Sequence, residues 1–262
     1  MRPVAQRSVT RRCRFAALLL LGLLGLTAVL AGCGAGVLPS VRSEPERLAL
    51  AERLAQKREY STAIELLKVY IASNAGSANV DNAIYLLGDC YLKTKDWSSA
   101  SLEFERLLRD FPESDSGASA SFRLAESYYG QSRSSDFDQV FTVKGEEQWQ
   151  SYLRDNPGHW LNPEARRRIL LAHVRLATKL THTGNLYLKM NQLKPARIYF
   201  ERVEREYPDT PLLADAWVGM AKCDVREGHK AEAVERLKQV EAQFAGRPVA
   251  DRAARERARL QN

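Results

Sequence analysis

The chain has 262 residues, of which 45% are hydrophobic and 27% are charged, and its formal net charge is +7. The basic excess comes from residues 1–14, which hold five arginines and no acidic residue; without them the formal net charge falls to about +2. The rest of the chain is therefore close to neutral, and its charge balance gives no reason to expect nucleic-acid binding.

The first predicted element is an export signal over residues 1–32. Its basic start is followed by a largely apolar run over residues 15–30, which is short for a membrane span and typical of a signal-peptide core. Residues 30–33 read Leu-Ala-Gly-Cys, a lipobox, at which bacterial signal peptidase cleaves in front of a diacylated cysteine. We therefore predict a lipoprotein signal peptide and a Cys33 that carries diacylglycerol and an N-acyl lipid. A plain signal peptide or an uncleaved anchor is the alternative.

Three further regions follow the signal. Residues 33–43 contain Gly, Pro and Ser without periodicity and are predicted to be a lipidated tether. Helical periodicity then continues over residues 44–246. Residues 247–262 are rich in arginine on a helix-favouring background, and we predict a basic tail or a capping helix there.

A recurring set of four marks organises residues 44–246. Each set starts with a small residue, followed by alanine, an aromatic residue and proline at fixed intervals. The marks are Gly184, Ala196, Phe200 and Pro208 in one copy, and Gly88, Ala100, Phe104 and Pro112 in another. Small residues let two antiparallel helices approach, the aromatic residue fills the space beside them, and proline ends the second helix. This tetratricopeptide pattern predicts an all-α fold, an α-solenoid of about five tetratricopeptide-like helical hairpins. An ordinary helical bundle with chance spacing is the alternative.

The other three copies of the pattern are weaker. Ala51 and Ala63 mark the first repeat, and Ala221 and Ala233 mark the fifth. In the third repeat the second helix, marked by Trp149, comes late, and the following first helix is expected to be about fourteen residues longer than the others. Residues 130–145 form the one long irregular stretch, which we predict to be a partly ordered loop near the groove.

No residue pattern indicates an enzyme. The four histidines lack the i, i+4 spacing of a paired metal site, and the sequence has no Cys-x-x-Cys zinc motif, glycine-rich phosphate loop or Gly-x-Ser-x-Gly elbow. Glu146 and Glu147 are adjacent acids, but at a predicted helix start the helix dipole explains them. Cys90 and Cys223 occupy the same position in distant repeats and are expected to be buried small hydrophobic residues rather than a disulfide. We expect no catalytic residue, no metal ion and no cofactor apart from the lipid on Cys33.

In stacked hairpins the first helix of each pair lines a concave groove, so the chain is interpreted as a binding scaffold. The groove positions of repeats two and three are predicted to bind an extended peptide: Asn82, Tyr85, Asp89, Lys93, Phe122, Glu126 and Tyr129. The same positions in later repeats are Asn185, Lys189, Lys222 and Arg226. Aromatic faces mixed with single charges and amides are typical of a peptide groove. For Tyr85 and Phe122, packing between neighbouring repeats is the alternative.

A lipobox followed by five tetratricopeptide repeats resembles the BamD family, lipoproteins of the β-barrel assembly machinery. The closest stretch is Gly-Asn-Leu-Tyr-Leu-Lys over residues 184–189, then Ala196, Phe200 and Glu-Tyr-Pro-Asp-Thr-Pro over residues 206–211. The late second helix of the third repeat also fits the architecture of this family. The resemblance runs from residue 33 to about residue 245.

The resemblance implies an adaptor that is lipid-anchored at the periplasmic face of the outer membrane. The N-terminal repeats of the family receive unfolded outer-membrane proteins by their C-terminal signals, and its C-terminal repeats dock the periplasmic domains of the barrel-forming subunit. By this resemblance the partner-docking residues are Asn185, Lys189, Lys222 and Arg226, and no nucleic-acid partner is expected. A different class stays open: a periplasmic repeat lipoprotein that acts as a structural adaptor for cell-wall, pilus or secretion machinery.

Overall fold

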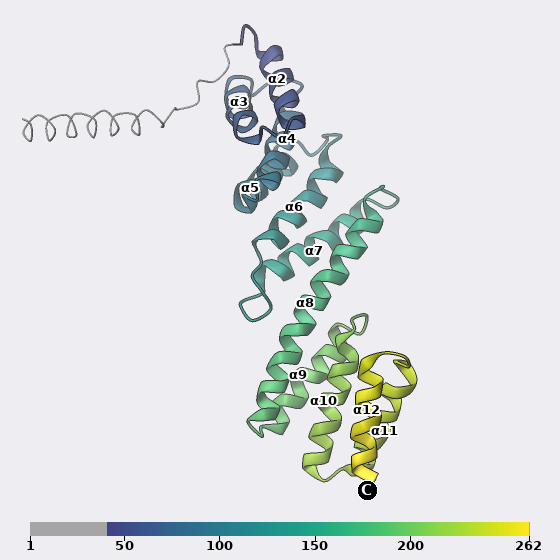
Figure 1. The fold of residues 1–262 in the computed structure, drawn as a ribbon. Helices are drawn as coiled ribbons and strands as arrows, with labels where there is room; N and C mark the ends of the chain where they lie inside the picture. The colour runs from purple at the N-terminus through teal and green to yellow at the C-terminus, as the bar shows by residue number, and fades with distance from the viewer. Residues whose placement is uncertain (1–40, 262) are drawn as a thin grey trace, which may run out of the picture. The chain divides into compact units, whose positions relative to one another are not determined.

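The computed structural model describes residues 41–261. The predicted signal peptide, the lipid site Cys33 and most of the predicted tether lie outside the described residues. From Glu44 onward the chain forms one compact unit. The described part of that unit consists of eleven α-helices and contains no β-strand (Figure 1). The predicted all-α fold is therefore confirmed.

The helices form five hairpins and a final single helix. The hairpins are α2 (Glu44–Gln56) with α3 (Tyr60–Ser73), α4 (Val80–Lys93) with α5 (Trp97–Asp110), α6 (Gly117–Gln131) with α7 (Val140–Asp155), α8 (Asn162–Lys189) with α9 (Leu193–Glu206), and α10 (Leu212–Glu227) with α11 (Lys230–Gln243). The last helix, α12 (Pro248–Gln261), packs on α11 and also touches α10. No helix within residues 41–261 combines the length and the apolar character that crossing a membrane requires.

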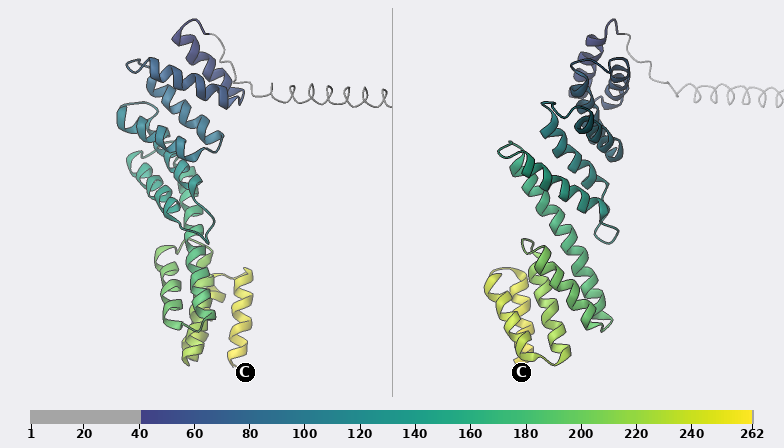
Figure 2. Two further views of the ribbon diagram at one scale, coloured as in Figure 1. Left: turned by 90° about the vertical axis from the view of Figure 1, so that its left-hand side faces the viewer. Right: turned by 180° about the vertical axis from the view of Figure 1, so that it is seen from behind.

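Successive hairpins stack on one another. Each helix packs on its neighbours in sequence, and first helices of adjacent hairpins also meet: α2 contacts α4, α4 contacts α6, and α8 contacts α10. Both views in Figure 2 show the hairpins following one another in chain order from α2 to α12. A single hairpin cannot bury its apolar face alone, so stacking supplies a continuous core. The compact unit is an α-solenoid of tetratricopeptide-like hairpins.

The glycine and aromatic marks of the repeat meet in the structure. A Cβ atom on Gly88 would lie 2.8 Å from the ring of Phe104, and a Cβ atom on Gly184 would lie 2.7 Å from the ring of Phe200. Only glycine admits a ring this close to the helix backbone. Phe200 is 0% exposed and also lies against Gly219 of the next hairpin, where an added Cβ would be 2.5 Å from the ring. Phe200 therefore joins the fourth hairpin to the fifth.

The third hairpin differs from its predicted boundaries. α6 continues to Gln131 and α7 begins at Val140, so the irregular segment is residues 132–139 rather than 130–145. The Asp138 carboxylate accepts a hydrogen bond from the backbone N–H of Val140 at 2.7 Å, which stabilises an earlier helix start than the sequence indicated. The following helix α8 has 28 residues against 14 in α4, as expected for a lengthened first helix.

Both cysteines of the helical region are buried and unpaired, as predicted. Cys90 lies in α4 and Cys223 in α10. Burial, assisted by the negative charge of Asp89, raises the pKa of the Cys90 thiol to about 12. The Cys90 thiol is therefore protonated at neutral pH and packs as a small apolar side chain.

Candidate functional site

Two surface hollows bring predicted site residues together. The first, which we call the arginine hollow, has a volume of about 480 Å³ and lies on α4, α6 and α8, with Trp97 contributed by the start of α5. Its lining residues are Leu92, Lys93, Trp97, Arg123, Glu126, Tyr129, Gly130, Ser132, Arg168 and Arg175. Three of the seven residues predicted to bind peptide, Lys93, Glu126 and Tyr129, therefore share one hollow.

Glu126 is the centre of an ionic network in the arginine hollow. Its carboxylate accepts a hydrogen bond from Arg123 at 2.6 Å and lies 3.0 Å from the Arg168 guanidinium. Arg123 also faces Asp89 at 3.6 Å, and Arg168 pairs with Glu164 at 2.7 Å. Two of the three arginines are therefore held in place by carboxylates of the protein itself.

The other two cations of this hollow are held differently. The Arg175 guanidinium lies 4.2 Å from the centroid of the Tyr129 ring and donates a hydrogen bond to the Ser132 hydroxyl. Lys93 is exposed at the end of α4. Within residues 41–261 neither Arg175 nor Lys93 has a carboxylate partner. The hollow therefore combines two fixed guanidinium groups and the aromatic ring of Tyr129 with two further cations, Arg175 and Lys93. Anionic or carbonyl groups of a ligand can reach these two cations.

Three predicted peptide-binding residues lie outside the lining of the arginine hollow but near the surface. Asn82 is exposed and accepts a hydrogen bond from the Ser116 hydroxyl at 3.2 Å. Tyr85 is half-buried, with its ring centroid 5.8 Å from that of Phe104. Asp89 adjoins the hollow through Arg123, 3.6 Å away. None of the three touches the open volume directly.

Phe122 is a core residue, so its assignment to the groove is wrong. Only 1% of its surface is exposed, and its ring centroid lies 5.6 Å from that of Tyr152 and 6.4 Å from that of Trp149. Both aromatic partners come from α7, which covers this side of α6. Burying three large rings together is worth more than presenting one of them to solvent. Phe122 therefore packs on aromatic rings of its own hairpin, whereas the alternative considered from the sequence was packing between neighbouring repeats.

Most of the cationic lining of the arginine hollow was not predicted from the sequence. Groove positions can be counted only within regular repeats, and the first half of α8 has no counterpart in a regular repeat. Arg168 and Arg175 lie on that extension, seven residues apart and hence on one face of the helix. That spacing is the signal that would have found them. Trp97 lies at the start of a second helix, where no groove position was expected.

The second hollow, which we call the lysine hollow, contains all four predicted docking residues. It has a volume of about 570 Å³ and is lined by His182, Asn185, Leu186, Leu188, Lys189, Lys222 and Arg226. The end of α8 and the end of α10 form its walls. Arg226 donates a hydrogen bond to the backbone carbonyl of Leu188, which ties the two helices together.

His173 of α8 links two segments that are distant in sequence. Its Nε2 lies 3.1 Å from Glu146 of α7, and its Nδ1 lies 2.8 Å from Asp209 in the turn between α9 and α10. The hydrogen bond with Glu146 and the one with Asp209 raise the pKa of His173 above its ordinary value, although burial opposes them. Tyr207 packs its ring edge-on against the imidazole. Glu146 is thus a tertiary contact in the second turn of α7, and its interpretation as a helix-start acid is wrong.

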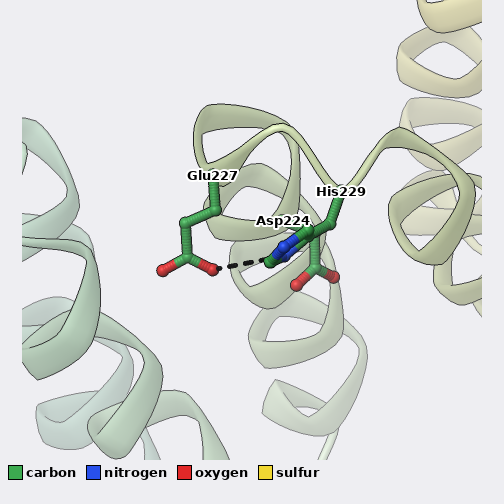
Figure 3. A group of neighbouring side chains, drawn as sticks. All are labelled: Asp224, Glu227 and His229. Carbon is green, nitrogen blue, oxygen red and sulfur yellow. Dashed lines mark ion pairs between the residues drawn. The ribbon is translucent and has the colours of Figure 1, made fainter.

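Asp224, Glu227 and His229 form a group in which possible metal-ligating atoms lie within 4.8 Å of one another (Figure 3). Both oxygens of the Asp224 carboxylate already accept hydrogen bonds, from Arg197 at 2.7 Å and from Arg236 at 3.3 Å. Glu227 also pairs with Arg197 at 2.5 Å. Two guanidinium charges oppose the approach of a cation, so we interpret the group as an ion-pair network that joins α9, α10 and α11.

A family model described as an outer membrane lipoprotein, YfiO, matches residues 51–240, which reach from α2 to α11. A comparison with curated proteins finds no match. Among solved structures, a thermophilic tetratricopeptide-repeat protein of Thermus thermophilus is 17% identical, with 81% of this chain and 97% of that chain covered and a TM-score of 0.38. YrrB, a repeat protein described as having an unusual peptide-binding site, is 16% identical, with coverages of 81% and 92% and a TM-score of 0.40. PilW, a type IV pilus biogenesis factor, is 14% identical, with coverages of 82% and 100% and a TM-score of 0.39.

Proposed function

The chain belongs to the YfiO (BamD) family of outer membrane lipoproteins, and we propose that it is an adaptor of the β-barrel assembly machinery. The lipid on Cys33 anchors it at the periplasmic face of the outer membrane. The arginine hollow binds extended segments of unfolded outer-membrane proteins, and the lysine hollow docks the barrel-forming subunit. The protein acts by holding two partners and carries out no covalent chemistry.

One observation supports this proposal most directly: a single open hollow contains Lys93, Glu126, Tyr129 and Arg175. An extended peptide offers unpaired backbone carbonyl and N–H groups along its edge and points alternate side chains to each side. Guanidinium groups donate to carbonyl oxygens, the Glu126 carboxylate accepts from N–H groups, and the Tyr129 ring packs on apolar side chains. Such a lining recognises the backbone more than a fixed sequence, which suits the binding of many different clients.

The peptide site is tested by fluorescence anisotropy with a labelled peptide from the C-terminal strand of an outer-membrane barrel protein. The protein is the full-length lipoprotein in detergent. The double substitution Tyr129→Leu and Arg175→Gln removes the aromatic ring of residue 129 and the guanidinium group that stacks on it. We expect the dissociation constant to rise more than tenfold, which corresponds to about 1.4 kcal/mol.

A matched double variant, Tyr60→Leu with Arg205→Gln, makes the same two changes on α3 and α9. It is expected to bind the peptide like the wild type. If the Tyr129 and Arg175 double variant is folded and its affinity is unchanged, the peptide site is assigned to the wrong surface. Phe122→Ala is unsuitable for this test because it opens the core beside Trp149 and Tyr152.

The docking role is tested by affinity purification from detergent-solubilised membranes. The barrel-forming subunit, with its periplasmic domains, is expected to co-purify with the wild type. Charge reversal of Lys189→Glu and Lys222→Glu is expected to reduce the recovered amount, because both cations line the lysine hollow. Recovery of pilus, secretin or peptidoglycan-associated proteins instead would place the chain with the structural adaptors of the cell envelope.

A further inference from the structure

A small apolar pocket opens beside the lysine hollow, between α10, α11 and α12. Its volume is about 140 Å³. Val218 and Ala221 of α10 and Leu237 of α11 form a buried floor, and the half-buried Val225 and Leu260 form its sides. We call this pocket the aliphatic socket. Neither the peptide site nor the ion pairs described above account for it.

The aliphatic side chains that line the socket favour a hydrocarbon group as its ligand. Five of its eight lining residues, those of the floor and sides, are aliphatic, so a water molecule held against the floor would have few polar partners. For scale, an enclosed apolar cavity of about 150 Å³ holds a molecule of the size of benzene. The socket therefore has room for one side chain such as leucine, isoleucine or methionine, and filling it removes apolar surface from water.

A loose ion pair lies at the mouth of the socket. The Lys222 Nζ and the Glu256 Oε1 are 3.9 Å apart, and both side chains are partly exposed. Pairs of this kind contribute little to stability. A carboxylate of a binding partner can therefore take the place of Glu256 beside Lys222 while a neighbouring aliphatic side chain enters the socket.

The socket and the lysine hollow form one continuous surface, because Lys222 and Arg226 line both. Within the described residues, Glu256 is the one acidic residue of the two linings, which also contain His182 and Lys189. This imbalance is complementary to an acidic partner segment. The surface along α10 therefore combines an apolar recess with a basic rim.

We propose that the aliphatic socket receives one aliphatic side chain of the docking partner, and that an Asp or Glu next to that side chain pairs with Lys222 and Arg226. The inference rests on the proposed docking function and specifies its chemistry. The buried side chain is the anchor that slows dissociation, and the basic rim sets the register and speeds association.

The test measures binding of the full-length protein, in detergent, to the soluble periplasmic fragment of the barrel-forming subunit from the same species. Val225→Trp fills the socket from α10, and Leu260→Trp fills it from α12. Each is expected to weaken binding more than tenfold in isothermal titration calorimetry. Val143→Trp adds the same indole to the exposed surface of α7 and is expected to change nothing. Circular dichroism and thermal unfolding establish that each variant is folded.

A second pair of variants tests the basic rim. Lys222→Glu with Arg226→Glu is expected to weaken binding more than tenfold and to remove most of the salt dependence that the wild type shows. Lys230→Glu with Lys238→Glu makes the same change of charge on α11, outside both linings, and is expected to retain binding. Equal losses in the two double variants would mean that net charge, and not this surface, attracts the partner.

The outcomes separate the inference from the docking function on which it rests. If Val225→Trp and Leu260→Trp both weaken binding of the periplasmic fragment, the aliphatic anchor is supported. If both are folded and bind like the wild type, the anchor is wrong and docking stands. If the wild type does not bind the fragment, the docking function and the anchor fail together. If the tryptophan variants instead abolish self-association in sedimentation, a second copy of the chain occupies the socket and the inference is overturned.

Discussion

The arginine hollow and the lysine hollow both use α8 as a wall, yet they hold their charges differently. In the arginine hollow Glu126 lies within 3.0 Å of both Arg123 and Arg168. In the lysine hollow Lys222 has a carboxylate at 3.9 Å, and Lys189 has none within the described residues. Both linings are basic, but two arginines of the first are fixed by carboxylates, whereas the cations of the second are loosely held.

This difference suits two kinds of partner. Side chains that are already fixed lose little conformational freedom on binding, so the arginine hollow can bind weakly interacting, variable segments without a large ordering cost. A basic surface attracts an acidic partner from a distance and rejects a basic one. Under the proposed function, the carboxylate pairing of the cations, and not the net charge of the lining, distinguishes the surface for many clients from the surface for one partner.

The largest expected effect comes from removing the support of the lysine hollow. Phe200→Ala deletes a fully buried ring that contacts Gly184 and Gly219 and joins the two hairpins beside this hollow. We expect the free energy of unfolding to fall by about 3–5 kcal/mol, as measured by urea denaturation. Leu102→Ala, on the exposed surface of α5, is the control and is expected to change stability by less than about 0.5 kcal/mol. A loss below about 1 kcal/mol for Phe200→Ala would mean that the ring is not a structural link.

The second prediction makes the arginine hollow resemble the lysine hollow. Glu126→Gln removes the carboxylate that Arg123 and Arg168 share, and it leaves both guanidinium groups without that partner. We expect a loss of about 1.5–3 kcal/mol of stability, together with tighter binding of acidic peptides in anisotropy measurements. Glu147→Gln, at an exposed position of α7, is the matched control. Unchanged selectivity between acidic and basic peptides would contradict the role given to Glu126.

The third prediction concerns pH and the contact that joins α7, α8 and the turn before α10. Hydrogen bonds with Glu146 and Asp209 raise the pKa of His173 above 6.5. Because the folded-state pKa is the higher one, this stabilisation is complete below the unfolded-state pKa and is lost as pH rises through the folded-state pKa. As pH is raised from below the unfolded-state pKa of His173 to above its folded-state pKa, we expect the free energy of unfolding of the wild type to fall by on the order of 1 kcal/mol relative to that of His173→Gln.

Thermal unfolding across that pH range measures the contribution of His173. Wild type and His173→Gln are expected to differ most at the acid end and to converge at the alkaline end. His182→Gln, whose imidazole is exposed and lies 3.4 Å from an exposed Asp136 carboxylate, is the control. Parallel pH profiles for wild type and His173→Gln would exclude the histidine contact as a source of stability.

The smallest expected effect concerns an exposed cation at the edge of the arginine hollow. Lys93→Gln removes one charge that has no carboxylate partner within the described residues. We expect peptide binding to weaken only two- to threefold, or about 0.5 kcal/mol, because water and salt screen such a charge. Measuring the dissociation constant at several salt concentrations checks this, since the variant should show a shallower dependence. Lys95→Gln, in the turn after α4, is the control.

The hairpin packing could be predicted from the sequence because its determinants lie close together in the chain. Gly88 and Phe104, like Gly184 and Phe200, belong to the two helices of a single hairpin joined by a short turn. Helical spacing alone then decides that ring and glycine meet. The same repeat register brought Asn185, Lys189, Lys222 and Arg226 into one hollow.

The arginine hollow could be predicted only in part, because the register breaks in the third hairpin. The long connection over residues 132–139 shifts the repeat register, so that Trp149 and Tyr152 of α7 cover Phe122, and the extension of α8 supplies Arg168 and Arg175. Contacts such as Glu146 with His173 depend on how helices from different hairpins approach. Spacing along one helix contains no information about that approach, so residue counting could not reveal it.

Helix α8 supplies a wall of both hollows, so the geometry of each depends on the same element. Arg175 and Lys189 lie on the same uninterrupted helix, separated along its axis by about 21 Å. A small axial shift or rotation of this helix would move the walls of both hollows at once. Two ligands that favour the same position of α8 would raise each other's affinity by an equal factor, because linkage between binding sites is reciprocal. Client binding and partner docking would then both depend on a single conformational equilibrium of α8.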